Sequence, residues 1–297
     1  MRHVWRTWPG RIGIVLVSLL VLSALVSYVW TPHDPTKVVP ADKWLPISWS
    51  HLFGTDGSGK DLFSQVLVGA RTTLVVSLSA VVIAAVIGLT LGVVSSITPR
   101  LVGESVAHVI DVLIALPTLI LALVFVAALG GSVWTVSLAI GLASGVVLAR
   151  IVRAEVSRVL TNDYIVTATA SGSSTWRTVW RHVIPNIAPT VIVQLSLIAA
   201  LAVLAEAALS YLGLTPVSTP SWGRMLESLQ QSMTVHPGTL VFPGLAVVAA
   251  TLGFNMLGDG LRDAVDPRLR GRTTLDPVLS AVVDDPAVAA VPEEVRR

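Results

Sequence analysis

Residues 72–97 read TTLVVSLSAVVIAAVIGLTLGVVSSI and contain no charged side chain. A helix needs about 20 predominantly apolar residues to cross the hydrocarbon core of a bilayer. This stretch is long enough to do so, and such a long continuous apolar run is not typical of a water-soluble domain. It therefore predicts a membrane-spanning helix and makes the chain an integral membrane protein.

The composition of the whole chain agrees with that prediction. Hydrophobic residues make up 53% of the 297 residues, charged residues only 13%, and the mean hydropathy is +0.77. Soluble domains carry about 25% charged residues. The chain has no cysteine, which excludes disulfides and thiolate zinc sites. A net charge of +2 gives no indication of nucleic-acid binding.

Five further apolar runs predict an all-α fold with six transmembrane helices. The additional spans are Ile12–Trp30, Val112–Leu129 with a break at Pro117, Val133–Ala149, Ile187–Leu209 and Thr239–Leu257. The first run follows a basic start, as a secretory signal would. No small-x-small cleavage pattern comes after it, so a retained anchor is the favoured interpretation.

The distribution of Lys and Arg predicts the orientation. Of the 20 basic residues, 15 fall in segments 1–11, 98–111, 150–186 and 258–297, and 5 fall in segments 31–71, 130–132 and 210–238. Cytoplasmic loops are enriched in Lys and Arg. We therefore expect both termini in the cytoplasm.

The same pattern divides the chain into three regions. Residues 1–71 are expected to form an anchor helix with an extracytoplasmic linker, and residues 72–271 the core transmembrane domain. The tail at 272–297 combines acidic residues with alanine, valine and proline, and disorder is expected there.

Two spans carry glycines four residues apart, Gly88/Gly92 and Gly141/Gly145. Small residues at this spacing let helix backbones approach closely in lipid. Ordinary packing within the helix bundle is sufficient to explain both pairs.

The segment at 150–186, RIVRAEVSRVLTNDYIVTATASGSSTWRTVWRHVIPN, is far longer than the 2–8 residues usual between packed helices. Its pattern predicts three short helices, Ala154–Leu160, Tyr164–Ala170 and Thr175–Val183. Asn162 or Asp163 can cap the second, Gly172 can end it, and Pro185 suits the first turn of the next span. A partner-docking element and an amphipathic loop both fit these features.

The residues of this segment carry a resemblance to a known family. The pattern Asp163-Tyr164, Ala168, Ala170, Gly172, Arg177, Arg181-His182, Pro185-Asn186 resembles the cytoplasmic EAA loop of bacterial ABC-importer permeases. More narrowly, the chain resembles the C-type permease subunit of the dipeptide/oligopeptide/nickel group. The stretches GTDGSGKDLFSQVLVGART, LSYLGLTPVSTPSWGRML and LGDGLRDAVDPRLR also match, so the resemblance covers about residues 10–271.

The resemblance implies a type I ABC-importer permease fold and a transport subunit of the bacterial cytoplasmic membrane. Its cargo would be di- or oligopeptides, with nickel or another small solute as the alternative. The implied partners are a second permease, two cytoplasmic ATPase subunits that bind ATP and Mg²⁺, and an extracytoplasmic substrate-binding protein. This chain would bind no cofactor and have no ATPase site of its own.

The resemblance also implies which residues couple the chain to the ATPase. They are Asp163, Tyr164, Ala168, Gly172, Arg177, Arg181, His182 and Pro185. The sequence departs from the family pattern at Val166, which stands where the motif has its glutamate, and at Thr167, which replaces the first alanine. The polar contact of that glutamate is therefore in doubt, although the helix itself is still expected.

Glu206 lies towards the outer end of the fifth predicted span. Ionisable groups inside membrane spans are functional candidates. A proton-coupled carrier could use Glu206 as its titrating group, but internal repeats typical of such carriers are missing from the sequence. The resembled family also has a glutamate in this pattern, which favours a structural or pathway-lining role.

Pro220 and Trp222 fall in the extracytoplasmic segment after that span. The resemblance makes them candidates for contact with the binding protein. An interfacial aromatic anchor at Trp222 is the rival interpretation.

Residues 54–61, GTDGSGKD, have the spacing of a phosphate-binding loop. That motif needs Ser or Thr after its lysine to hold Mg²⁺, and this chain has Asp61 there. We expect the glycines to form a turn and Asp61 to cap the following helix.

Enzymatic alternatives find little support in the sequence. The six histidines show no H-E-x-x-H pattern, so a catalytic zinc site is not expected. GLASG at 141–145 lacks the glycine that an intramembrane serine protease motif would need in place of Leu142.

Overall fold

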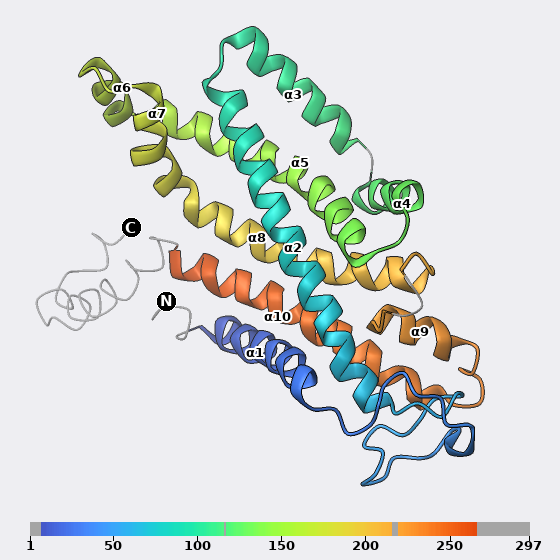
Figure 1. Cartoon of the computed structure of the whole chain (residues 1–297). Coiled ribbons are helices and arrows are strands. Elements are labelled where there is room, and N and C mark those ends of the chain that lie inside the picture. The colour runs from blue at the N-terminus through green and yellow to red at the C-terminus, as the bar shows by residue number, and fades with distance from the viewer. Residues whose placement is uncertain (1–6, 116, 216–218, 266–297) are drawn as a thin grey trace, which may run out of the picture.

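The computed structural model describes residues 7–115, 117–215 and 219–265, and these residues form helices joined by loops (Figure 1). Outside the helices, the described residues contain one isolated backbone bridge, between Thr55 and Asp61. The expectation of an all-α chain is therefore confirmed. The tail at 272–297, for which we expected disorder, lies outside the described residues.

Five helices are long and apolar enough to cross a membrane, and a bent helix pair would make a sixth span. Three of the five are single helices: α1 (Trp8–Val29), α2 (Leu62–Ile97) and α5 (Val133–Leu160). The fourth comprises α7 (Thr175–Thr178), a π-helical segment (Val179–Val183) and α8 (Ile184–Tyr211). The fifth is α10 (Val241–Val265), preceded by a 3-10 turn at Pro237–Leu240.

The third expected span differs most from its prediction. Instead of one helix over Val112–Leu129, the chain forms α3 (Arg100–Ile114) and α4 (Thr118–Leu129), bent by 85° at their junction. Pro117 stands directly before α4, and proline cannot continue a helix from the preceding turn. The break was expected, but α3 begins at Arg100, where we had expected a cytoplasmic segment.

Two expected helix boundaries in the 150–186 segment are wrong. Ala154–Leu160 is not a separate helix, because α5 continues without interruption to Leu160. Thr175–Val183 likewise runs straight into α8 and is not a separate helix, although Pro185 does lie in the first turn of α8, as expected. An apolar run in the sequence marks only the part of a helix that lies in lipid. These helices continue beyond that part, so their ends do not coincide with the ends of the runs.

Glycines bring α2 and α5 into close parallel contact. A Cβ on Gly88 would lie 2.5 Å from the Leu148 side chain, and one on Gly92 would lie 2.6 Å from Val152. On α5, a Cβ on Gly141 would lie 2.6 Å from Ile83. The two glycine pairs therefore line the same interface, which is the packing role expected of them.

The first and last spans, α1 and α10, pack against each other in antiparallel directions. A Cβ on Gly13 would meet the backbone of Leu257 at 2.3 Å, and one on Gly253 would meet Leu16 at 2.9 Å. The N-terminal helix is thus an integral member of the bundle, and its first turn lies at the same end as the last turn of α10.

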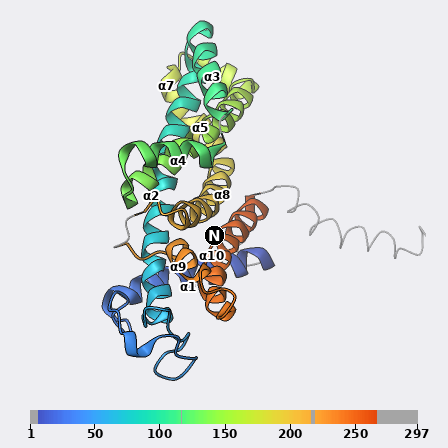
Figure 2. The same ribbon diagram turned by 90° about the vertical axis from the view of Figure 1, so that its right-hand side faces the viewer.

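The two ends of the bundle carry different segments of the chain (Figures 1 and 2). The linker end carries residues 30–61 together with α9 (Trp222–Gln230). The α6 end carries α6 (Asp163–Ala170), α7 and the α2–α3 connection. The segments expected on opposite sides of the membrane are thus gathered at opposite ends of the molecule.

Candidate functional site

The short helix α6 is set off from its neighbours by defined turns. The Asn162 side chain donates a hydrogen bond to the Val159 carbonyl 3.1 Å away, at the end of α5. After α6, Gly172 has a φ of +84°, a left-handed conformation that favours glycine. Ser174 then accepts a hydrogen bond from the Arg177 amide and caps α7. The expected short helix that ends before Gly172 is confirmed, whereas the side chain of Asn162, one of the two residues expected to cap α6, donates back to α5 instead.

Two contacts fasten α6 to the bundle. Ile165 is buried in an apolar cluster with residues of α5 and the π-helical segment, including Val159 and Val179. The Tyr164 hydroxyl accepts a hydrogen bond from the Asn186 side chain at 2.7 Å. Asn186 belongs to α8 and Val159 to α5, so these contacts join α6 to the long helices on both sides of it.

The remaining predicted coupling residues lie on the same end of the molecule. Arg177, Arg181 and Pro185 are exposed, and His182 is half-buried with its ring 6.4 Å from that of Tyr164. The side chains of Val166 and Ala168 lie outside what the structure describes. Sequence reasoning missed two exposed indoles, Trp176 and Trp180, which meet edge to face at 6.2 Å.

At the linker end, α9 lies across α2 and α8. The Trp222 indole is only 3% exposed, and its N–H donates to the Val66 carbonyl at 2.9 Å. A Cβ on Gly69 would lie 2.6 Å from that indole. Trp222 therefore holds α9 onto α2 with its ring buried inside this chain.

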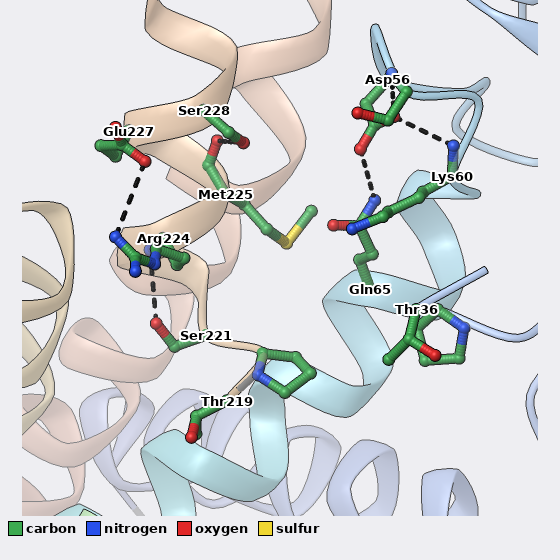
Figure 3. A pocket seen from close by; sticks show the side chains of 13 residues that line it. Thr36, Asp56, Lys60, Gln65, Thr219, Ser221, Arg224, Met225, Glu227 and Ser228 are labelled. Atoms are coloured by element: carbon green, nitrogen blue, oxygen red, sulfur yellow. Dashed lines mark hydrogen bonds and ion pairs between the residues drawn. The ribbon is translucent and has the colours of Figure 1, made fainter. Parts of the chain in front are cut away.

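A groove opens beside this helix (Figure 3). It has a volume of about 500 Å³. Its lining comprises Pro35, Thr36, Asp56, Ser58, Lys60 and Gln65 on one side, and Thr219, Pro220, Ser221, Arg224, Met225, Glu227 and Ser228 on the other. Both signs of charge face the groove, and the predicted contact residue Pro220 forms part of its wall.

Glu206 is buried inside this chain, at 1% exposure. Its carboxylate accepts hydrogen bonds from Ser210 at 2.7 Å and from Thr73 of α2 at 3.3 Å. The carboxylate thus links α8 to α2 close to the linker end. It lies far along α8 from the coupling residues, so the two sets of predicted site residues are not brought together.

The glycine-rich stretch at 54–61 forms a turn rather than a phosphate cradle. Its own carboxylate, Asp56, accepts hydrogen bonds from the amides of Ser58 at 2.7 Å and Lys60 at 3.0 Å. Those amides are the kind of donors that a phosphate would require. Asp61 accepts from the Ser64 amide at 2.8 Å and caps α2, as expected.

Sequence reasoning missed one cluster at this end. His33 and His51 stack with ring centroids 4.5 Å apart, and both rings approach Asp61. Their separations of 18 and 10 positions along the chain match no recognised ligand motif. The loop conformation alone brings them together.

Comparison with known proteins identifies the kind of chain to which these features belong. Residues 84–271 match the family model described as "Binding-protein-dependent transport system inner membrane component". That range includes α6, its flanking helices, Glu206, the α9 segment and α10.

Curated relatives are similar over most of the chain. The dipeptide transport system permease protein of Alkalihalophilus pseudofirmus is 34% identical over 87% of this chain and 86% of its own length. The oligopeptide transport system permease protein of Bacillus subtilis is 33% identical over 88% and 86%. The di/tripeptide transport system permease protein of Pseudomonas aeruginosa is 34% identical over 91% and 93%.

Proposed function

The chain belongs to the family of inner-membrane components of binding-protein-dependent transport systems, and from this we propose that it is one of two permease subunits of an ATP-driven peptide importer. The observation that carries the proposal is the similarity to relatives named for dipeptide, oligopeptide and di/tripeptide transport. It extends over about nine-tenths of the chain, well beyond any single motif.

In the proposed assembly the linker end faces outward and the α6 end faces the cytoplasm, with both termini inside. A second permease completes the pathway, and a substrate-binding protein delivers peptide from outside. Two ATPase subunits bind ATP and Mg²⁺ and perform the hydrolysis, so this chain does no bond chemistry and binds no cofactor.

The α6 end supports a docking role for the ATPase. The helix α6 contacts two long helices and carries the exposed ring of Tyr164. The segment after it adds two exposed cations, Arg177 and Arg181, and two exposed indoles, Trp176 and Trp180. An ATPase can shift the permease between inward-open and outward-open states only if it binds the two states with different free energies. A helix tied to both α5 and α8 transmits that difference into the membrane.

The groove at the linker end supports contact with the binding protein. It combines Lys60 and Arg224 with Asp56 and Glu227, and mixed charge suits recognition of a protein surface that carries both signs. Pro220 contributes directly, whereas Trp222 acts beneath the surface by holding α9 in place.

Uptake measurements test this function. We expect deletion of the gene to abolish ATP-dependent uptake of radiolabelled di- and tripeptides, and a plasmid copy to restore it. In the complemented strain, Arg181→Glu should reduce peptide uptake at least tenfold while ATP hydrolysis persists, because charge reversal weakens the docking surface.

The matched control is Lys43→Glu, an equally drastic charge reversal on an exposed side chain at the linker end and outside the groove, which should leave uptake intact. Unchanged peptide uptake after deletion would refute the function. Unchanged uptake in the Arg181 variant alone would refute the docking role of the α6 end.

A further inference from the structure

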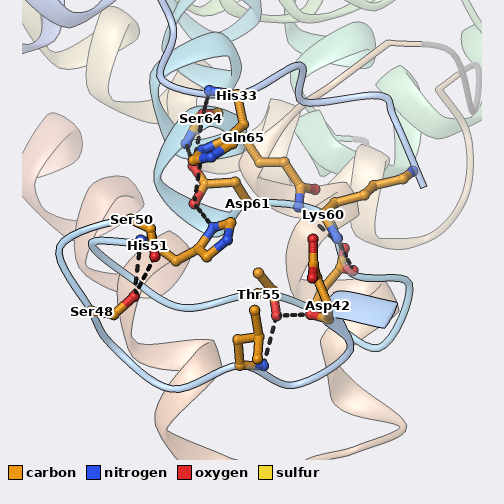
Figure 4. Close-up of polar contacts among 12 residues, drawn as sticks. His33, Asp42, Ser48, Ser50, His51, Thr55, Lys60, Asp61, Ser64 and Gln65 are labelled. Carbon is orange, nitrogen blue, oxygen red and sulfur yellow. Dashed lines mark hydrogen bonds and ion pairs between the residues drawn. The ribbon is translucent and has the colours of Figure 1, made fainter. Parts of the chain in front are cut away.

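Three side chains from separate segments converge at the linker end (Figure 4). His33 follows α1, His51 lies in the loop before the glycine-rich turn, and Asp61 caps α2. One ring nitrogen from each histidine and one carboxylate oxygen of Asp61 all lie within 4.8 Å of one another. We propose that these residues bind a divalent transition-metal cation of the Zn²⁺ type.

The distances from the two imidazoles to Asp61 are compatible with a shared metal ion. His51 Nδ1 lies 2.9 Å from Asp61 Oδ1, whereas His33 Nδ1 lies 3.8 Å from the same oxygen, too far for a hydrogen bond. Two ligand atoms on a tetrahedral Zn²⁺ are about 3.3 Å apart, given bond lengths near 2.0–2.1 Å. The two observed distances bracket that value, so each needs a movement of about half an ångström.

The ligands are already oriented by their surroundings. The second carboxylate oxygen, Asp61 Oδ2, accepts hydrogen bonds from the Ser64 amide at 2.8 Å and the Ser64 hydroxyl at 2.7 Å. Oδ1 is thereby turned towards the imidazoles. Fixed outer contacts of this kind are typical of metal ligands and strengthen binding.

The two histidines are held through their backbones. The His33 amide donates to the Ser64 hydroxyl oxygen at 3.1 Å, and the His51 amide donates to the Ser48 hydroxyl at 3.1 Å. One serine, Ser64, thus contacts both Asp61 and His33. These hydrogen bonds hold the loops independently of the His51–Asp61 hydrogen bond. Replacing that bond by metal coordination therefore leaves the loop conformation unchanged.

The three side chains differ in solvent exposure, from the surface of the protein to its interior. The side chain of His33 is 43% exposed, that of His51 is 11% exposed and that of Asp61 is 2% exposed. A cation can enter past His33 and reach a buried carboxylate. Two imidazoles and one carboxylate leave a coordination position for water, and this donor set suits Zn²⁺ and its neighbours in the first transition row.

Bound metal would join three segments that otherwise meet only through hydrogen bonds. It would fix the segment after α1 and the 48–54 loop to the first turn of α2. The role is a cross-link of the linker end, independent of the transport function proposed above and different from the catalytic zinc sites considered from the sequence.

Direct binding measurements on the full-length chain in lipid nanodiscs test the site, with an affinity tag that contains no histidine. Isothermal titration with ZnCl₂ should give one site per chain with a micromolar or lower Kd. At Zn²⁺ concentrations about 100-fold above Kd, the apparent Tm should rise by about 5 °C, because only the folded chain offers the assembled ligands.

Two variants and a matched control decide the assignment. His33→Ala and Asp61→Asn should each weaken Zn²⁺ binding at least tenfold, and asparagine keeps the capping acceptor for α2. His236→Ala, which removes a half-buried imidazole stacked on Trp44 at the same end, should bind Zn²⁺ as the parent does. Unaltered affinity in His33→Ala, or no saturable binding below about 100 µM in the parent chain, would overturn the proposal.

Discussion

Glu206 shows how much a single side chain contributes at the residue scale. Its carboxylate joins α8 to α2 through Thr73 and also accepts a hydrogen bond from Ser210 of α8, which in turn accepts one from Thr215 at 3.1 Å. Directly beside it, a Cβ on Gly223 of α9 would lie 2.1 Å from the Ala207 carbonyl oxygen. Glu206 therefore lies where α2, α8 and α9 meet, a position in which its hydrogen bonds stabilise the packing of these helices.

We expect Glu206→Gln to support peptide uptake close to that of the parent chain. The carboxamide oxygen can accept from one hydroxyl, and its NH₂ group can donate to the other. Glu206→Leu should lower the apparent Tm, because each buried hydroxyl left without a partner costs about 1–3 kcal/mol.

Uptake assays in the presence and absence of a protonophore distinguish the two transport mechanisms. If Glu206→Gln folds normally but abolishes uptake, and uptake by the parent collapses with the proton gradient while ATP is maintained, then the secondary-carrier alternative is correct.

At the scale of elements, the contact between α2 and α5 depends on glycine. Gly92 is the most constrained of the four, because its Cβ would meet both the Val152 side chain at 2.6 Å and the Ala149 carbonyl oxygen at 2.8 Å. A side chain can rotate away from an added methyl group, but a backbone carbonyl cannot do so without moving α5.

Gly92→Ala should therefore destabilise the bundle by about 1–3 kcal/mol, the usual cost of overpacking. For a chain of this size we expect the apparent Tm to fall by roughly 3–10 °C, measured by fluorescence-detected size exclusion after heating. Gly244→Ala is the matched control, since Gly244 lies in α10 with nothing within 4 Å of an added Cβ. Alanine there should leave Tm unchanged or raise it, because it favours helix. Equal losses in both variants would contradict the packing argument.

The elements also show what the sequence could and could not predict. Long apolar runs predicted every described helix that is long enough to span, Gly172 predicted the end of α6, and Asp61 predicted the start of α2. Helix continuity was missed where polar residues carry a helix out of its apolar run: α5 continues from Ala149 to Leu160, and Arg158 pairs with Glu155 in its last turns. The π-helical segment at Val179–Val183 has no distinctive residue pattern and could not be foreseen.

The functional features divide in the same way. The coupling residues stay a prediction; they could be named because they are close in sequence, within Asp163–Pro185, and that segment is local enough to carry a recognisable pattern. The groove and the His33–His51 contact were not, because each depends on how a long loop folds against distant helices. Local pattern does not encode such contacts.

At the scale of the whole molecule, the segments assigned to opposite sides of the membrane lie at opposite ends of the bundle. Arg71 reinforces the linker end: its Nε donates to the Ser27 hydroxyl at 2.6 Å, and its guanidinium lies 4.1 Å from the Tyr28 ring centroid. This pairing connects α1 to α2 where both helices emerge towards the linker.

The absence of cysteine allows a direct test of orientation, because single cysteines can be introduced without removing native ones. Ser58→Cys, exposed at the linker end, should react with a membrane-impermeant maleimide in intact cells. Ser171→Cys, exposed at the α6 end, should react only after the cells are permeabilised. The opposite labelling pattern would show that the termini are outside.

The long helix that begins at Thr175 and ends at Tyr211 has a mechanical consequence. At 1.5 Å per residue, its 37 residues have a helical length of about 55 Å, and they include the π-helical segment at Val179–Val183 and Pro189 inside α8. The helix contacts α6 through Asn186, in its first third, and α2 through Glu206 near its other end. These two contacts are about 30 Å apart along the helix axis, so a tilt of about 5° midway between them would displace each by about 1.3 Å in opposite directions. One continuous stretch of backbone thus joins the contact at the α6 end to the contact near the linker end.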